Sequence, residues 1–295
     1  MFISGTSYAQ VTVEERNRIW TAIPEQAPAA PAKPRKILVV NLHVWDGQVA
    51  QGHISIPYGN LALKWMGERT GAFETVFTDD TLMFLPENLR KFDAVCFNNT
   101  VGVLFEDPVL RKSLLDFVAD GKGFIGLHAA AATYVQWPEY GQFPEYGEMI
   151  GGYENGGHPW KPYEWIVLRV EEPGHPVMQA FQRETFPVSD EVFQFQKPYS
   201  RDKLRVLLVI DPVQTNINED RHILPERRGD LDLAVSWIRE YGKGRVFYSA
   251  LGHNPHIFWD RDILGHFLAG IQFALGDLNT DARPSNRVPG KQNRR

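Results

Sequence analysis

The chain has 295 residues, about twice the ~150 residues of an ordinary domain, so one enlarged domain or two ordinary ones fit its length. A hydrophobic share of 43% is typical of a globular protein and excludes a mainly disordered chain. A net charge of -5 with no basic stretch in the body argues against a nucleic-acid partner, and the single cysteine, Cys96, excludes a disulfide framework and a multi-cysteine zinc site.

The first 35 residues indicate an N-terminal extension. Residues 1–10 lack the basic start of a secretory signal, yet Ser7-Tyr8-Ala9 has the small-x-small form that precedes signal cleavage. Residues 26–35 are rich in proline and alanine, which favours a tether over a core element. We therefore expect a signal remnant and a linker over residues 1–35 and a periplasmic or secreted protein. A cytoplasmic protein with a flexible N-terminus is the alternative.

Strands and helices alternate in the next part of the chain. Residues 36–42 form a continuous apolar run, as in a parallel strand that is covered on both faces. One helix is predicted from Pro57 to Gly71, and a second between the N-cap Asp107 and Gly121. This alternation predicts βαβ units in an α/β fold with an open parallel sheet, whose further strands are expected at residues 73–77, 92–97 and 123–127.

The second half combines long loops with additional strands. Residues 134–165 are irregular and rich in glycine and aromatic residues, which is typical of a functional loop. No apolar run approaches the ~20 residues of a membrane helix, so we expect no membrane insertion. We predict one domain over residues 36–277 with an amphipathic last helix around residues 259–271, and a disordered tail over residues 278–295. Its further strands are expected at residues 163–170, at Phe193 and Phe195, and at residues 204–210, 233–237 and 244–251.

Polar residues follow the predicted strands. Open α/β sheets bind ligands at the carboxyl ends of their strands, which here carry residues 41–53, Asn98-Asn99-Thr100 and His128. His128 occupies the turn between strand and helix where hydrolase-like and amidotransferase-like α/β proteins hold a nucleophile. Because Cys96 belongs to a different strand, the pattern disfavours a thiol-dependent glutamine amidotransferase.

Several short motifs occur in order between about residue 36 and residue 276. They are Gly52-His53-Ile54-Ser55-Ile56-Pro57, Phe97-Asn98-Asn99-Thr100, Gly126-Leu127-His128-Ala129-Ala130, Tyr146-Gly147-Glu148, Gly157-His158-Pro159-Trp160, Gly174-His175-Pro176-Val177, Asp190-Glu191-Val192-Phe193, Gly242-Lys243-Gly244-Arg245-Val246-Phe247-Tyr248 and Gly252-His253. Together they resemble the ThuA-like (trehalose utilisation) family, which is related in fold to class I glutamine amidotransferases. The resemblance implies a flavodoxin-like, mostly parallel sheet with helices on both faces, without the amidotransferase cysteine. It also implies a link with disaccharide and keto-sugar catabolism.

Three residues are the candidate catalytic groups: His128, Glu191 and His253. Neighbouring side chains on a regular strand face opposite ways, so only one of Asp190 and Glu191 can enter a pocket. We choose Glu191 as the acid or base, because Phe193 and Phe195 would share its face and raise its pKa by desolvation. His128 would serve as base or ligand, and His253 is expected to meet it above the sheet.

The remaining candidates are substrate and metal contacts. His53, His128 and His253 offer the nitrogen donors of a transition-metal site, although the H-E-x-x-H signature is absent. The sequence indicates no definite cofactor, and it leaves a divalent transition metal open. Aromatic rings in the loops suit stacking on sugar rings, and Asn, Glu and His groups suit bonding to hydroxyls. The expected substrate contacts are His53, Ser55, Asn98, Asn99, Glu148, His158 and Trp160.

We therefore expect an enzyme acting on a glycoside or a 3-keto-glycoside, a hydrolase or a lyase, with a small-molecule sugar as its partner. The family resemblance suggests elimination, because a 3-keto group acidifies the neighbouring C–H, so that one base and one hydrogen-bond donor can expel the leaving group. The sequence is compatible with an acid/base mechanism and with a metal-assisted mechanism. A non-catalytic sugar-binding or scaffold protein and a degenerate amidotransferase-type partner subunit are the alternatives, and a homo-oligomer is compatible with either.

Overall fold

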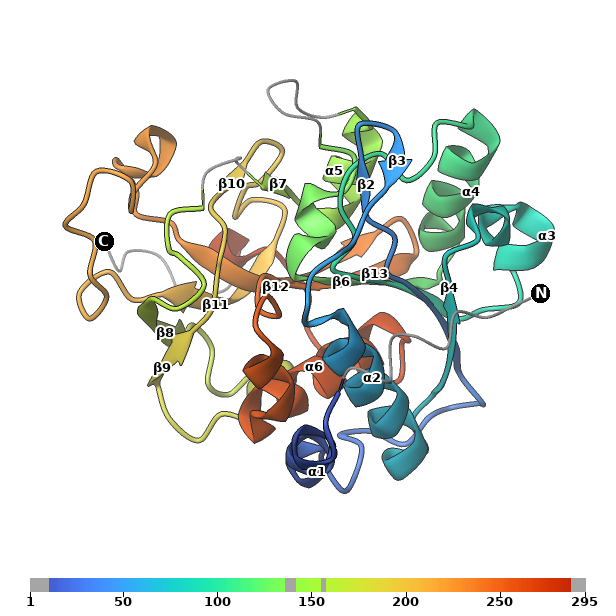
Figure 1. Ribbon diagram of the computed structural model, residues 1–295, viewed down its shortest axis with the longest axis horizontal. Helices are drawn as coiled ribbons and strands as arrows, with labels where there is room; N and C mark the ends of the chain where they lie inside the picture. The colour runs from blue at the N-terminus through green and yellow to red at the C-terminus, as the bar shows by residue number, and fades with distance from the viewer. Residues whose placement is uncertain (1–10, 136–141, 155–157, 288–295) are drawn as a thin grey trace.

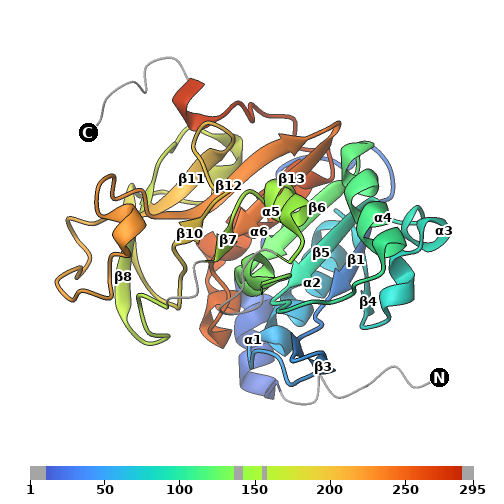
Figure 2. The same cartoon turned by 90° about the horizontal axis from the view of Figure 1, so that it is seen from above.

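A nine-stranded sheet forms the centre of the molecule. The computed structural model describes residues 11–135, 142–154 and 158–287. Five strands run parallel in the order β4 (Glu74–Thr78), β1 (Lys36–Val40), β5 (Ala94–Asn98), β6 (Gly123–Leu127) and β13 (Gly244–Ser249). Antiparallel pairing then adds β12 (Ala234–Tyr241), β11 (Arg205–Ile210), β8 (Trp165–Val170) and β9 (Thr185–Ser189). Figure 2 shows these two halves side by side.

Helices cover both faces of this sheet, as Figure 1 shows. One face carries α1 (Val13–Ala22), α2 (Ile56–Thr70) and α6 (Arg261–Ala274), and the other carries α3 (Pro86–Leu89), α4 (Pro108–Ala119) and α5 (Pro144–Ile150). The expected open α/β sheet with helices on both faces is therefore confirmed. The smaller elements are the hairpin β2 (Val44–Trp45) and β3 (Gln48–Val49), the pair β7 (Tyr153–Glu154) and β10 (Phe195–Gln196), and the short helices η1 (Thr81–Phe84), η2 (His128–Ala132), η3 (Pro176–Met178), η4 (Pro225–Arg227), η5 (Pro255–Trp259) and η6 (Ser285–Arg287).

Local signals in the sequence set the helix boundaries. Helix α2 has a proline in its first turn and ends at Gly71, whose φ of 68° lies in the left-handed region that favours glycine. Helix α4 begins after Asp107, whose carboxylate accepts a hydrogen bond from the Val109 N–H (2.8 Å). Strands β5 and β6 are buried along their whole length, as expected for parallel strands between two helical layers.

The segment before β1 differs from the expected free extension. Helix α1 begins at a capping box of Thr12 and Glu15 and buries Ile19 completely. The Pro/Ala-rich segment is fastened to α6, because Ala29 exchanges two backbone hydrogen bonds with the side chain of Gln272. The tether interpretation of residues 26–35 was therefore wrong, since composition does not reveal which side chains a segment will meet. Residues 1–10, with the proposed signal remnant, lie outside the described residues.

The segment after α6 also differs from the expected tail. The N–H of Ser285 donates to the Leu204 carbonyl (2.9 Å), and its hydroxyl oxygen accepts from the Val206 N–H (2.8 Å). Ser285 is thus held against β11, and the expected disorder is wrong for residues 278–287; residues 288–295 lie outside the described residues. No helix in the described part of the chain is both long enough and apolar enough to cross a membrane.

Candidate functional site

The polypeptide turns sharply at His128, at the carboxyl end of β6. His128 has a φ of 45°, a left-handed conformation that is uncommon for a residue with a side chain. The Tyr248 hydroxyl donates to the His128 carbonyl (2.8 Å), which fixes the turn. The Nδ1 of His128 lies 2.8 Å from the Ala250 carbonyl oxygen, which can only accept, so Nδ1 carries the proton. In the neutral ring, Nε2 then keeps its lone pair. Burial, followed by the neighbouring His53 and His253, lowers the pKa of His128 well below its usual value.

His253 stands on a loop that Asp190 holds in place. The Asp190 carboxylate accepts hydrogen bonds from the N–H groups of Gly252 (2.7 Å), His253 (3.3 Å) and Asn254 (2.8 Å). Burial raises the pKa of Asp190 to about 7, although the three N–H donors act in the opposite direction. Sequence reasoning set Asp190 aside and missed this positioning role, for which the adjacent pair of acidic residues was the available signal.

Glu191 faces the histidines, as expected, although not from a strand. Its Oε1 lies 3.3 Å from His253 Nδ1 and 3.9 Å from His128 Nε2, and its Oε2 lies 3.7 Å from His158 Nδ1. Burial alone would raise the pKa of Glu191, but the hydrogen bond and charge of His253, with help from His158 and His53, lower it. The expected rise in its pKa was therefore wrong.

The position of Phe193 explains part of the difference between the expected and the observed surroundings of Glu191. Residues 190–194 lie between β9 and β10 and not in a regular strand, so the expected alternation does not apply there. The ring of Phe193 stacks on His128 instead, with a centroid distance of 4.6 Å and an interplanar angle of 22°. This contact orients the imidazole and leaves Glu191 surrounded by histidines.

His53 completes the group from the loop before α2. Its ring centroid lies 5.1 Å from that of His128 and 5.0 Å from that of His253. Its Nδ1 is buried without a hydrogen-bond partner, and burial, followed by the charge of His253, lowers its pKa to about 4. We call His53, His128, His253 and Glu191 the imidazole cluster, and His158, half of whose side chain is exposed, lies beside it.

Three of the expected substrate contacts are buried beneath the imidazole cluster. The Ser55 hydroxyl donates to the Gly252 carbonyl (2.7 Å), and the Asn99 amide lies 3.3 Å from the same oxygen. The Asn98 amide donates to the Asn60 side chain (3.0 Å). All three side chains are buried, and their amide or hydroxyl groups are engaged by the protein: Ser55 and Asn99 support the loop of His253, and Asn98 is bonded to Asn60.

Two other candidates are held elsewhere. Glu148 lies on α5 and forms an exposed ion pair with Lys203 (2.9 Å). Trp160 is 1% exposed and stacks on His222, so neither of its faces is free for a sugar ring. The structure thus brings His53, His158 and the three catalytic candidates together, and it separates Glu148 and Trp160 from them.

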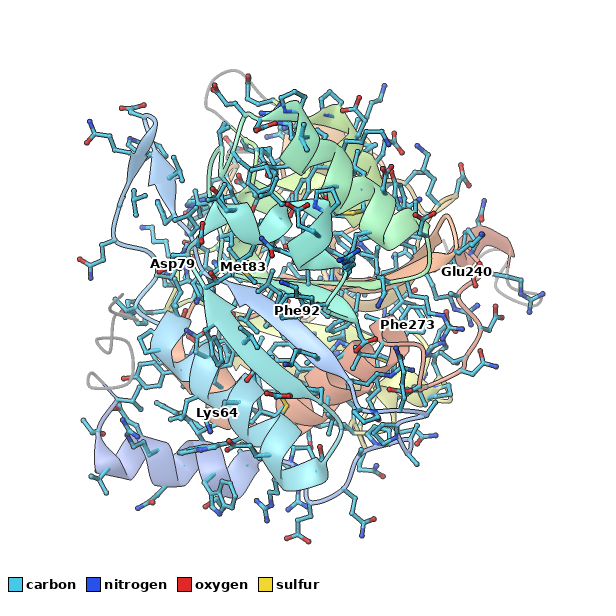
Figure 3. All side chains as sticks on the ribbon, turned by 90° about the vertical axis from the view of Figure 1, so that its right-hand side faces the viewer. Lys64, Asp79, Met83, Phe92, Glu240 and Phe273 are labelled. Atoms are coloured by element: carbon cyan, nitrogen blue, oxygen red, sulfur yellow. The ribbon has the colours of Figure 1, made fainter. Side chains whose placement is uncertain are left out.

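A cavity of about 710 Å³ is lined by the β2–β3 hairpin and by the loops that follow β4 and β5, and no residue of the imidazole cluster lines it. Leu42 and Val44 line this cavity, whereas His43 between them points toward His53, with a centroid distance of 6.2 Å. Asp79 also lines the cavity, and Figure 3 shows it at the edge of the molecule below the hairpin. The converging nitrogen and carboxylate atoms lie at the cluster, and none of them lines the cavity.

Comparisons with known proteins agree on the family and the fold. Residues 41–274 match the family model of ThuA, described as trehalose utilisation. A ThuA-like protein from Bacteroides uniformis ATCC 8492 is 18% identical, with a TM-score of 0.61, covering 84% of this chain and 94% of that one. A ThuA-like protein from Parabacteroides merdae ATCC 43184 is 17% identical, with a TM-score of 0.58, covering 84% and 93%.

A cytoplasmic protein from Salmonella typhimurium LT2 is 13% identical, with a TM-score of 0.51, covering 81% of this chain and 99% of that one. No curated protein matches the chain by sequence. At these identities the solved structures are evidence for the fold alone.

Proposed function

The chain belongs to the ThuA (trehalose utilisation) family, and from this premise we propose that it is a carbohydrate-active enzyme that cleaves a glycoside or a 3-keto-glycoside at the imidazole cluster. One observation carries the proposal. Three histidines and a carboxylate from separate loops converge at the carboxyl edge of the parallel strands, which is the edge where open α/β sheets bind their ligands.

His128 suits the role of general base. Its Nδ1 proton is committed to the Ala250 carbonyl, so the opposite nitrogen, Nε2, is free to accept a proton. In a 3-keto-glycoside the C–H beside the keto group is acidic enough for such a base. When the base removes that proton, the C–H electron pair forms a C=C bond, and the bond from carbon to the glycosidic oxygen breaks.

The departing oxygen then needs a proton, and the pair of His253 and Glu191 suits this role. Their closest atoms, Glu191 Oε1 and His253 Nδ1, lie 3.3 Å apart, so a proton can pass between the carboxylate and the imidazole. The same pair is partly open to solvent on the side of His253, 22% of whose side chain is exposed. His158 stands at this opening, where its ring can bond a sugar hydroxyl.

The test is turnover of oxidised and unoxidised disaccharides. Purified protein is incubated with trehalose and with its 3-keto derivative, and the released sugars are followed by chromatography and NMR. We expect cleavage of at least one of them, and a loss of roughly 10²-fold or more in Glu191→Gln and His253→Ala, as for the removal of a general acid or base.

His256→Ala is the matched control, because it removes a partly exposed histidine three residues after His253 and should leave turnover unchanged. Sugar binding without turnover, unaffected by His128→Ala, would contradict the proposal and favour a sugar-binding or scaffold protein. Turnover that appears only with a second chain, seen together on a sizing column, would favour the partner-subunit alternative.

A further inference from the structure

We propose that the imidazole cluster binds one divalent transition metal ion of the zinc class through His53, His128, His253 and the carboxylate of Glu191. The inference rests on the proposed function for its substrate class. An ion on His128 Nε2 would take up the lone pair of that nitrogen, so at a metal-loaded cluster Lewis-acid polarisation of the sugar would replace the acid/base roles assigned above. The binding itself is argued from the positions of the donor atoms.

Two of the donor separations match those of a tetrahedral centre. Zn–N bonds of about 2.0–2.1 Å place neighbouring donors about 3.3 Å apart. His128 Nε2 lies 3.2 Å from His253 Nδ1, which in turn lies 3.3 Å from Glu191 Oε1. Each of the three histidines has a ring nitrogen within 4.8 Å of those of the other two. Glu191 Oε1 is the fourth donor, 3.3 Å from His253 Nδ1 and 3.9 Å from His128 Nε2.

Too few protons are available to join these donors to one another. The His128 proton points away, to Ala250, so Nε2 presents a lone pair to the cluster. The Nδ1 of His253 can donate one proton, either to this lone pair or to Glu191, but not fully to both. His53 adds a buried Nδ1 without a partner. A metal cation satisfies the lone pair of His128 and the carboxylate of Glu191 at once, which a single shared proton cannot do.

Charge and rigidity also favour a metal ion. Within the described part of the chain, the ion pairs of Glu191 are all with histidines, so no lysine or arginine neutralises its carboxylate. The backbone contacts of His128, the stacked Phe193 and the carboxylate of Asp190 hold two of the ligands in place before any ion arrives.

A second group of residues of metal-binding types differs from the imidazole cluster in having an arginine beside its carboxylates. Glu164, Glu219 and His222 also bring their donor atoms together, but Arg221 forms ion pairs with both carboxylates. A fixed guanidinium already supplies the positive charge there. We therefore assign no metal to that group.

The ion would keep a face open for substrate. His253 and His158 are partly exposed, whereas His128 lies underneath. A metal with three protein nitrogens and one carboxylate can add a fifth ligand, and as a Lewis acid it would polarise a keto or hydroxyl oxygen of a bound sugar.

Metal binding is measured without reference to activity. The full chain is treated with a chelator, returned to buffer and titrated with Zn²⁺ by calorimetry, and with Co²⁺ by visible absorption, while elemental analysis gives the stoichiometry. We expect one ion per chain, a Co²⁺ spectrum of a four- or five-coordinate site, and at least about 100-fold weaker binding in His53→Ala and Glu191→Gln.

Two control variants locate the site. His256→Ala and His222→Ala should bind the ion as the wild type does, and circular dichroism verifies that each variant is folded. Binding of well under one ion per chain, or full binding by both His53→Ala and Glu191→Gln, would overturn the inference. Sugar turnover by the metal-free protein would overturn a role for the metal in the reaction. Tight metal binding without sugar turnover would support the metal site and contradict the proposed function.

Discussion

His266 gives the most quantitative prediction, because it lies in the core, remote from the imidazole cluster. It is completely buried in α6, with Nδ1 3.0 Å from the Val177 carbonyl and Nε2 2.9 Å from the Ser236 hydroxyl. Burial, opposed by the bond to Val177, lowers its pKa from 6.5 to about 4, and His175 contributes in the same direction as burial. The folded protein therefore keeps this ring neutral where the unfolded chain protonates it.

The sign and size of the effect follow from this difference. Between pH 6.5 and pH 4 the unfolded state binds one more proton than the folded state at this residue, so stability is lost as the pH falls. At 1.36 kcal/mol per pKa unit, the loss reaches about 2 kcal/mol at pH 5 and about 3 kcal/mol near pH 4. Above pH 7 the residue contributes no pH dependence.

The assay is urea unfolding of the wild type and His266→Asn at pH 7, 6 and 5, followed by circular dichroism. Because His53 and His128 remain in both proteins, their titrations cancel in the difference. We expect the stability advantage of the wild type over the variant to shrink by about 2 kcal/mol between pH 7 and pH 5. A difference that stays constant over this range would refute the assignment of His266 as a buried neutral ring.

Three further predictions concern stability, each read from thermal or urea unfolding. Ile19→Ala should lower the free energy of unfolding by about 2–5 kcal/mol, because α1 is docked on the rest of the protein. The control Val13→Ala removes an exposed side chain of the same helix and should change that free energy by less than about 0.5 kcal/mol. Equal effects of the two substitutions would mean that α1 is not docked. Gly252→Ala should lower the free energy of unfolding by about 1–3 kcal/mol, because the φ of Gly252 is 131° and an added Cβ would lie 3.4 Å from His128 Cβ. No loss of stability would contradict the strain that this φ implies. Tyr248→Phe should cost about 1–3 kcal/mol by leaving the His128 carbonyl unpaired, and an unchanged midpoint would contradict that bond.

Much of the fold could be predicted because its signals are local. The apolar run at residues 36–42 corresponds to β1, and the proline and glycine around α2 mark its two ends within a residue. These local signals failed for segments that are held in place by residues far away in the sequence. Residues 26–35 and 278–287 lack the composition of core elements, yet side chains and backbone far along the chain, such as Gln272 and Leu204, hold them in place.

The candidate site shows the same division. A histidine after a buried strand and an acidic pair were visible in the sequence, and the structure brings His128, His253 and Glu191 together as expected. The acidic pair marked Asp190 in the sequence, but it could not show which of the two carboxylates enters the cluster and which accepts the N–H groups of the His253 loop, because that depends on the fold of both loops. The sequence also could not show that Trp160 is covered, since exposure depends on the rest of the chain.

The sequence by itself determined the main alternating strands and helices between β1 and β6, the absence of an amidotransferase thiol at the turn after β6, and the edge of the sheet where polar groups collect. Only the tertiary structure decided which of those groups meet. His128 and His253 are 125 residues apart in the chain, and their rings come within 3.2 Å because β6 and β13 pair in parallel and end at the same edge. Strand register and backbone hydrogen bonds in the loops set such distances, and both depend on contacts between distant segments.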